Sequence, residues 1–346
     1  MPRFTPIPSE LRRRPFQLSD AVAAGVTPRM LQGRRFRRIH QGVWICADVE
    51  LTTEMRYDAA RLALPPGAIG SHQLAAEILD LIVPRASKPQ FWLPESAKGS
   101  TYPGIRPHWF QEKPDSVTVH GREVTTAAKT FIDLATQLRA LDLVVFGDSA
   151  VRRGWTTQEE LVALSRERGR RHIRRARWAA ALARAGVDSR PETLLRLLLV
   201  LAGLPEPETG VAVSDAHGGW IAAPDLSYPR VKIAIEYDGL HHFTDRSQRI
   251  LDVARNANLI GDGWKVIVVL DHHLFQPARA DHHAGARCTS RARPSRRAPM
   301  AYGRVARSLR VRPRHRRTLF VPCTIAEVRL QDVSTAILRV KLVPRR

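Results

Sequence analysis

The chain has 346 residues, of which 44% are hydrophobic, and it carries a formal net charge of +22. A chain of this length and composition can bury a sizeable core and is expected to form two or three domains. Residues 281–346 hold 17 Lys and Arg against 3 acidic residues, a net +14, which leaves +8 for residues 1–280. A basic body attracts polyanions, so the charge favours DNA as a partner.

The apolar segments and the cysteines argue against four classes of protein: membrane-spanning, secreted, zinc-finger and disulfide-scaffold proteins. The longest apolar run, residues 194–204, is interrupted by Arg196 and is too short to span a bilayer, and residues 1–6 contain no apolar signal-peptide region. We therefore expect a cytoplasmic protein without membrane contact. Cys46, Cys288 and Cys323 are far apart and form no C-x-x-C pair, which argues against a zinc finger and a disulfide scaffold.

Residues 1–50 are expected to form a winged helix-turn-helix DNA-binding unit. Residues 16–31 predict two short helices around a glycine turn, with Thr27 as N-cap and Pro28 in the first turn of the second helix. The basic run 34–45 alternates like a β-wing, and its arginines can hold phosphates. The alternative is a helical hairpin that packs or dimerises while its arginines are solvated. The candidate DNA-binding residues are Arg29, Arg34, Arg35, Arg37 and Arg38.

Residues 51–180 are expected to form a connecting α+β unit. The arginine-rich segment 166–177 is open to two interpretations, a basic patch or a solvated helix and linker. Periodicity predicts helices at 53–63, 71–82, 127–140 and 156–167, and strands at 90–93, 104–110 and 116–124.

Residues 187–275 are expected to form a third unit with a mixed sheet flanked by helices, which makes the chain α/β, or α+β overall. Ser189 and Glu192 fit a capping box before an apolar helix at 194–202, which Gly203 and Pro205 end. Strands then run to Asp238, followed by a polar helix at about 245–260 and a strand at 265–270.

Two acidic residues are expected on one face of this sheet. If Pro229 and Arg230 are the two loop residues of a hairpin, Asp225 lies opposite Ala234. Asp225 and Glu236 are then diagonal neighbours with β-carbons roughly 5 to 8 Å apart, a separation that a metal ion can bridge.

The residues around Asp225 and Glu236 also favour a metal site. Asp238 shares the face, and His241 and His242 continue the polar cluster at the strand end. The opposite face, with Ile233 and its neighbours 235 and 237, is expected to be the buried one. The alternative is an acidic strand face that is simply solvated.

The order of polar positions in residues 187–275 resembles a family of uncharacterised actinobacterial proteins with a C-terminal DUF559 domain. That domain is similar to the very-short-patch repair endonuclease and belongs with restriction-endonuclease-like folds. Residues 16–140 resemble, more weakly, the winged-helix domain of the AbiEi antitoxin type. The nuclease-like resemblance covers about 85 residues and is carried by Ser189, Glu192, Pro224, Asp225, Glu236, Asp238, Gly239, His241, His242, Phe243, Arg249, Asp252, Arg255 and residues 263–266.

The resemblance implies roles for the acidic residues and the histidines. Asp225 would be the first-strand metal ligand and Glu236 the second-strand ligand, with Mg²⁺ or Mn²⁺ as the cofactor. Glu192 would take the place of the helical acidic residue. Asp238 stands where a lysine is expected, which puts catalysis in doubt. His241 or His242 would substitute as base or metal ligand, or would simply make a strand-end hydrogen bond.

The implied function is metal-dependent hydrolysis of DNA phosphodiester bonds, so the catalytic candidates are the six residues just named. The competing hypothesis is a non-catalytic transcriptional regulator or antitoxin of a type IV toxin-antitoxin system. Its degenerate nuclease domain would serve dimerisation or sensing, and a toxin would be its partner. Residues 281–346 read as a disordered basic tail, a nucleic-acid-binding tail, or the product of a frameshift near residue 275.

Overall fold

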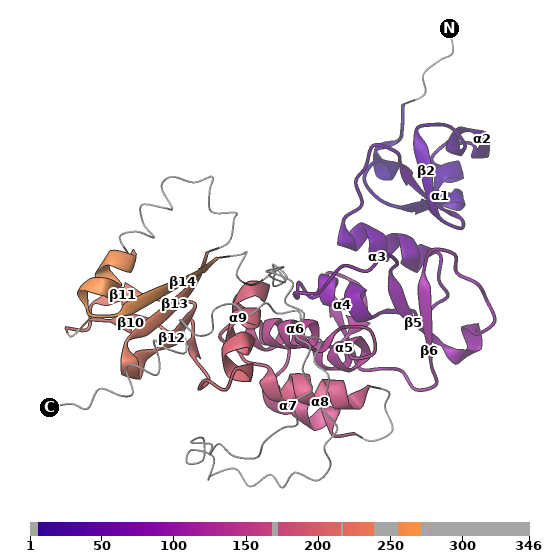
Figure 1. Cartoon of the computed structure of the whole chain (residues 1–346). Coiled ribbons are helices and arrows are strands. Elements are labelled where there is room, and N and C mark those ends of the chain that lie inside the picture. Colours follow the sequence, from indigo (N-terminus) through magenta and orange to yellow (C-terminus); the bar gives the residue numbers. More distant parts are fainter. Residues whose placement is uncertain (1–5, 168–171, 216, 239–254, 271–273, 275–346) are drawn as a thin grey trace, which may run out of the picture. The chain divides into compact units, whose positions relative to one another are not determined.

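The computed structural model describes residues 6–167, 172–215, 217–238, 255–270 and 274. The described chain is a mixed α/β protein with several separate sheets (Figure 1). Within these residues, no helix has both the length and the apolar character needed to cross a bilayer. The expected tail at 281–346, the histidines His241 and His242, and most of the expected polar helix lie outside the described residues.

The N-terminal unit consists of two short helices and a three-stranded sheet in the order β1-β3-β2. Thr27 caps the second helix, since its Oγ1 accepts a hydrogen bond from the Met30 N–H at 3.3 Å, and Pro28 follows it as predicted. Gly42, with φ +74°, turns the hairpin between the last two strands. The elements are η1 (Ser9–Leu11), β1 (Phe16–Gln17), α1 (Leu18–Ala23), α2 (Pro28–Leu31), β2 (Phe36–His40) and β3 (Val43–Cys46).

The middle unit is built on a five-stranded sheet in the order β6-β5-β4-β8-β7. The pairs β5/β6 and β4/β8 are parallel, whereas β4/β5 and β7/β8 are antiparallel. Helices and strands share one large hydrophobic core around Phe91, Phe131 and Phe146. The elements are α3 (Thr53–Leu62), β4 (Ile69–Gly70), α4 (His72–Ile78), β5 (Gln90–Pro94), η2 (Glu95–Ala97), β6 (Arg106–Phe110), β7 (Ser116–Val119), β8 (Arg122–Thr125), α5 (Ala127–Leu134), α6 (Ala140–Arg152), α7 (Gln158–Ser165) and α8 (Ile173–Leu182).

Two predictions for the middle unit need correction. The strand expected at 116–124 is a hairpin, because His120 (φ 48°) and Gly121 (φ 76°) turn the chain between β7 and β8. The helix expected at 127–140 ends at Leu134, and α6 begins separately at Ala140. Helix α6 is buried over most of its length and therefore lacks the one-sided apolar stripe from which helices are recognised in sequence.

The C-terminal unit contains a four-stranded sheet in the order β14-β13-β12-β9, and a separate pair, β10-β11. Helix α9 precedes the sheet and ends in a Schellman motif at Gly203 (φ 85°), where Leu204 N–H donates to the Leu199 carbonyl. Residues 255–261 are helical and lead into the last strand. The elements are α9 (Arg190–Leu201), β9 (Glu208–Thr209), β10 (Val213–Ser214), β11 (Trp220–Ala222), β12 (Leu226–Tyr228), η3 (Pro229–Val231), β13 (Ile233–Asp238) and β14 (Lys265–Leu270).

A buried ion pair joins α9 to the middle unit. Arg196 of α9 is fully buried, and its Nη2 lies 3.0 Å from Oδ2 of Asp148 on α6. Thr193 Oγ1 and the Arg184 N–H also donate to the Asp148 carboxylate, each at 2.8 Å. Glu206 accepts a hydrogen bond from the other end of the Arg196 guanidinium at 2.6 Å. Helix α9, which opens the C-terminal unit, is thus anchored by charge to the preceding helices.

Candidate functional site

The hairpin that carries the two acidic residues has a register different from the predicted one. Its loop contains the four residues 229–232 instead of two, and Lys232 adopts a left-handed conformation (φ 50°, ψ 50°). Tyr228 pairs with Ile233, and Leu226 pairs with Ile235. The prediction that Asp225 lies opposite Ala234 is therefore wrong by two residues. Because a shift of two residues leaves every side chain on its face, one further step in this register puts Asp225 opposite Glu236.

Both faces of strand β13 are buried, which corrects the expectation of one buried and one polar face. Ile233 and Ile235 are fully buried on one face, and Ala234 and Glu236 are 0% and 6% exposed on the other. Ala234 packs with Leu259 and other apolar residues of the unit. A solvated acidic face is therefore excluded for Glu236, although Asp238 at the strand end is exposed.

Asp225 is a partly buried carboxylate in negative surroundings. Its Oδ2 accepts a hydrogen bond from the Tyr237 backbone N–H at 2.8 Å. Burial is the main cause that raises the pKa of Asp225 from 3.8 to about 6, and the negative charges of Glu192 and Asp188 add to it. The Tyr237 N–H and the positive charge of Arg255 act in the opposite direction. Asp225 can therefore change its charge near neutral pH.

Glu236 forms an ion pair with Arg255. The Nη2 atom of Arg255, in the helical segment 255–261, lies 2.8 Å from Oε2 of Glu236. The arginine side chain is 31% exposed and the glutamate side chain 9% exposed, so the pair lies at the edge of the buried region. The resemblance includes Arg255, but the sequence alone gave it no role in the site, because nothing in the residue pattern shows which face of the polar helix meets the sheet.

Glu192 has the local structural role that the capping box predicts. Its Oε2 accepts a hydrogen bond from the Asp188 N–H at 2.9 Å, and its Oε1 accepts one from the Ser189 hydroxyl at 2.6 Å. Ser189 in turn caps α9 by accepting from the Glu192 N–H. Both oxygens of Glu192 thus serve the helix start, while its charge still reaches Asp225.

The hairpin register puts Asp225 opposite Glu236 and adds no third predicted ligand to the pair. Within the described ranges, no group of three or more histidine, cysteine or acidic side chains is arranged to hold a metal ion. Asp238 is exposed at the end of β13, and His241 with His242 lies beyond the described part of the chain. The candidate site is therefore the two carboxylates of Asp225 and Glu236 with the cation of Arg255.

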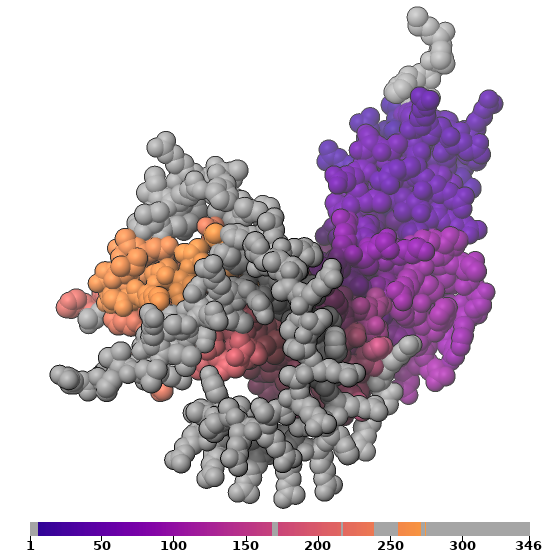
Figure 2. All heavy atoms as spheres, viewed as in Figure 1, coloured from indigo at the N-terminus to yellow at the C-terminus, as the bar shows by residue number. Residues whose placement is uncertain are grey.

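The predicted DNA-binding arginines divide into two groups, all in the N-terminal unit drawn in indigo in Figure 2. Arg29, Arg34 and Arg38 are exposed. Arg35 and Arg37 are half-buried, and Arg37 donates to the Val49 carbonyl at 2.7 Å. The exposed group is thus available to a polyanion, whereas Arg37 also holds the end of the hairpin.

Two arginines of the segment 166–177 donate hydrogen bonds to backbone carbonyl groups of the helical core. Arg175 donates to the carbonyls of Ala135 and Leu138, beyond the end of α5. Arg177 donates to the Ser165 carbonyl at 2.7 Å, at the end of α7. Cations at helix carboxyl ends satisfy unpaired carbonyl groups, so these two arginines stabilise the helical core.

The comparisons with known proteins give distant relatives of unknown activity. The chain is 31% identical over 163 residues to the uncharacterized protein Rv2248 of Mycobacterium tuberculosis strain H37Rv and to the uncharacterized protein MT2308 of strain CDC 1551. The aligned region covers 46% of this chain and 60% of each relative. No protein-family model matches the chain.

Proposed function

We propose that this chain is a DNA-binding protein whose C-terminal unit hydrolyses DNA phosphodiester bonds with a divalent metal ion, Mg²⁺ or Mn²⁺. The observation that carries the proposal is the hairpin register, which puts Asp225 and Glu236 on one face of the sheet. A partly buried carboxylate that lies near other negative charges and has a raised pKa is a common mark of a functional site. The resemblance to DUF559 domains and to the very-short-patch repair endonuclease supports the same reaction.

The residues present fit a hard divalent cation. Mg²⁺ and Mn²⁺ prefer carboxylate oxygens, and both candidate ligands are carboxylates. Burial raises the pKa of Asp225, and the charges of Glu192 and Asp188 add to the rise; a bound cation would counteract both, because nearby positive charge favours the ionised form. When bound, such an ion supplies an activated water and neutralises charge that develops on the phosphate.

The chain's own residues contribute orientation and charge. The Tyr237 N–H fixes one oxygen of Asp225, and the guanidinium of Arg255 holds one oxygen of Glu236. Asp238 replaces the lysine expected in this fold, and it is exposed. Arg255 lies beside the carboxylates and provides a positive charge that can offset charge on the phosphate in place of that lysine.

The N-terminal unit would hold the duplex by its phosphates, in the manner of an AbiEi-type winged helix. Its two helices, hairpin and exposed Arg29, Arg34 and Arg38 are consistent with this role. Replacing both Arg34 and Arg38 by glutamine is expected to lower DNA affinity for all sequences. The slope of log affinity against log salt should fall by about 2, since each phosphate contact contributes about 0.9.

Cleavage of supercoiled plasmid in Mg²⁺ or Mn²⁺ tests the proposed reaction. Asp225→Ala and Glu236→Ala should each abolish metal-dependent cleavage and leave DNA affinity nearly unchanged, and the milder Asp225→Asn and Glu236→Gln should do the same. Glu208→Gln is the matched control, because Glu208 is an exposed acidic residue on β9 of the same sheet. Full cleavage by both variants of the pair would overturn the assignment.

A second candidate function is a non-catalytic regulator or type IV antitoxin, as a monomer or homodimer, with a toxin as partner. The Glu236–Arg255 ion pair favours it, because a guanidinium already neutralises one of the two carboxylates. Absence of the lysine at position 238 favours it as well. Tight, specific binding to its own promoter without cleavage in any divalent metal would support this function over the nuclease. We expect the cytoplasm to be the site of either function.

A further inference from the structure

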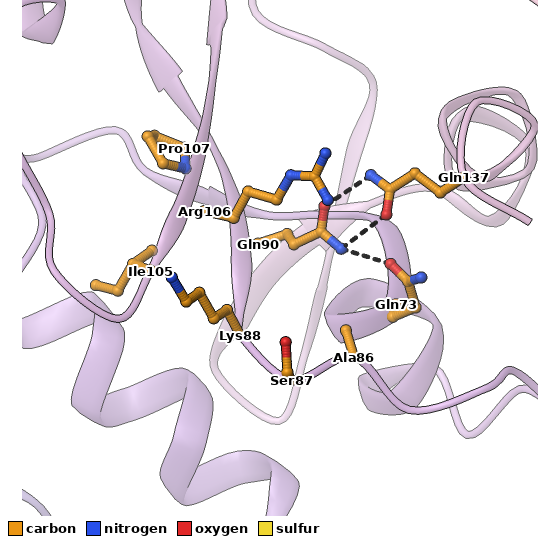
Figure 3. A pocket seen from close by; sticks show the side chains of 9 residues that line it. All are labelled: Gln73, Ala86, Ser87, Lys88, Gln90, Ile105, Arg106, Pro107 and Gln137. Atoms are coloured by element: carbon orange, nitrogen blue, oxygen red, sulfur yellow. Dashed lines mark hydrogen bonds between the residues drawn. The ribbon is translucent and has the colours of Figure 1, made fainter.

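A hollow of about 520 Å³ opens in the middle unit, where the parallel strands β5 and β6 begin (Figure 3). It is separate from Asp225 and Glu236 and from the arginines of the N-terminal unit. Its volume falls in the range of small-molecule sites, which is roughly 300 to 1,000 Å³. We call it the Gln90 pocket, and the lining residues that matter here are Gln73, Lys88, Gln90, Ile105, Arg106 and Gln137.

Gln90 is a buried amide whose hydrogen bonds are fully used. Its Nε2 donates to Oε1 of Gln73 at 2.5 Å and to Oε1 of Gln137 at 3.1 Å. Its Oε1 accepts from Nε2 of Gln137 at 2.8 Å and lies 3.0 Å from Nε2 of His108. An amide offers two donor hydrogens and two acceptor positions, so Gln90 has none left for a ligand.

His108 fixes the direction of this network. Burial is the main cause that lowers the pKa of His108 to about 3, so the ring is neutral at physiological pH and one nitrogen carries a hydrogen. Because the Gln90 carbonyl oxygen can only accept, its contact with His108 Nε2 assigns that hydrogen to Nε2. The ring also stacks on buried His72 with centroids 4.1 Å apart. The Gln90 nitrogen is thereby directed at the oxygens of Gln73 and Gln137.

The outer glutamines consequently keep more donors than acceptor positions, three N–H groups against two. The carbonyl oxygens of Gln73 and Gln137 both accept from Gln90. Gln137 keeps one N–H after donating to Gln90, and the Gln73 amide nitrogen donates to none of the residues that the structure describes. A site that offers N–H groups matches an oxyanion, because deprotonated oxygens only accept hydrogen bonds.

The charge of the lining agrees with this donor pattern. Lys88 and Arg106 are exposed cations, and none of the lining residues is acidic. Figure 3 shows the Arg106 side chain extending toward the Gln90 and Gln137 amides. Within the described residues, neither Lys88 nor Arg106 is paired with a carboxylate. By contrast, Arg56 on α3 pairs with Glu77, and Arg122 on β8 pairs with Asp58. Buried Ile105 adds an apolar wall beside these cations.

We propose that the Gln90 pocket binds a phosphate monoester of mononucleotide size. Lys88 and Arg106 take the phosphate, and the remaining N–H groups of Gln73 and Gln137 hold its oxygens or a carbonyl of the organic part. The pocket is larger than inorganic phosphate needs, so the organic part of the ligand lies against Ile105 and Pro107. This site acts independently of the proposed cleavage of DNA.

Titration calorimetry of the full chain with AMP, inorganic phosphate and adenosine tests this proposal. AMP should bind more tightly than either of the other two. Lys88→Gln and Arg106→Gln should each weaken AMP binding about tenfold, the effect of losing one charge-assisted contact. Gln137→Glu should also weaken it at least as much, since it replaces the donor by an anion. Arg85→Gln is the matched control, because Arg85 is an exposed cation of the same loop that does not line the pocket.

Three results would overturn the assignment. One is the absence of AMP binding at millimolar concentration to folded wild-type protein, with folding checked by circular dichroism. Another is equal loss of affinity in Arg85→Gln and in the two pocket variants, which would indicate nonspecific attraction. The third is equal affinity for AMP and inorganic phosphate, which would contradict a ligand of mononucleotide size.

Discussion

Two carboxylates, the buried Asp148 in the middle unit and the partly buried Asp225 in the C-terminal unit, have different surroundings. Burial is the main cause that raises the pKa of each. The negative charge of Asp148 is compensated by the Arg196 guanidinium, the Thr193 hydroxyl and the Arg184 backbone N–H. Asp225 receives the Tyr237 N–H and the more distant charge of Arg255, and it lies near two further negative charges, Glu192 and Asp188. The comparison teaches that burial alone does not indicate a site, whereas burial with nearby like charges and weaker compensation marks a candidate.

The largest expected effect on stability comes from breaking the buried ion pair between Arg196 and Asp148. Arg196→Met would leave Asp148 buried without its cation and is expected to lower the free energy of unfolding by about 3 to 5 kcal/mol. Urea denaturation measures this loss. The control is Arg139→Met, since Arg139 is 83% exposed and its pair with Asp142 should contribute less than about 1 kcal/mol. Equal losses in the two variants would contradict the difference between buried and exposed pairs.

The next largest effect is the pH dependence of folding stability that Asp225 causes. Because the pKa of Asp225 in the folded protein, about 6, lies above its ordinary 3.8, the ionised group destabilises the fold above pH 6. This penalty, at most about 3 kcal/mol, disappears as the pH falls from 6 toward 4. Asp225→Asn keeps an acceptor for the Tyr237 N–H and removes the penalty, so it should be more stable than wild type at pH 8.

The stability difference between Asp225→Asn and wild type should shrink as the pH falls to 4. Denaturation midpoints of both proteins in metal-free buffer from pH 4 to pH 8 measure it. Glu208→Gln, which alters an exposed carboxylate, should show a much smaller difference over this range. A pH-independent difference for Asp225→Asn would mean that its pKa is not raised.

The smallest expected effect on stability comes from removing one hydrogen bond to Asp148, the one that Thr193 donates. Thr193→Val removes the hydroxyl that donates to Asp148 at 2.8 Å and keeps the shape of the side chain. A buried hydrogen bond to a charged group is expected to contribute about 1.5 to 3 kcal/mol, and the remaining Arg196 contact should limit the loss to the lower end. Thermal or urea unfolding measures it, and no loss at all would show that Arg196 and the Arg184 N–H compensate Asp148 without the hydroxyl.

The sequence predicted much of the local structure, because local signals are short in range. Thr27 and Ser189 as N-caps, Gly203 as the helix end and the strand at residues 265–270 are all present. These features depend on a few neighbouring residues and on backbone conformation, so they can be read without knowledge of the fold.

Features that depend on contacts distant in sequence were not predictable in the same way. The hairpin register was wrong because loop length sets it, and a four-residue loop with Lys232 in a left-handed conformation replaced the assumed two-residue loop. The pairing of Arg196 with Asp148 joins positions 48 residues apart. Arg255 was likewise placed beside Glu236 only by the packing of its helix on the sheet.

The most direct test of a metal site formed by Asp225 and Glu236 is calorimetric titration of Mn²⁺ into the full chain at pH 6. The titration is done in two buffers of different ionisation enthalpy. Asp225 is partly protonated at this pH, so metal binding should release protons and the apparent enthalpy should differ between the buffers. Saturable binding with proton release, lost in Asp225→Asn and in Glu236→Gln but kept in Glu208→Gln, is the predicted result. Undiminished Mn²⁺ binding by the first two variants, or none by the wild-type protein, would contradict a metal site formed by these two carboxylates.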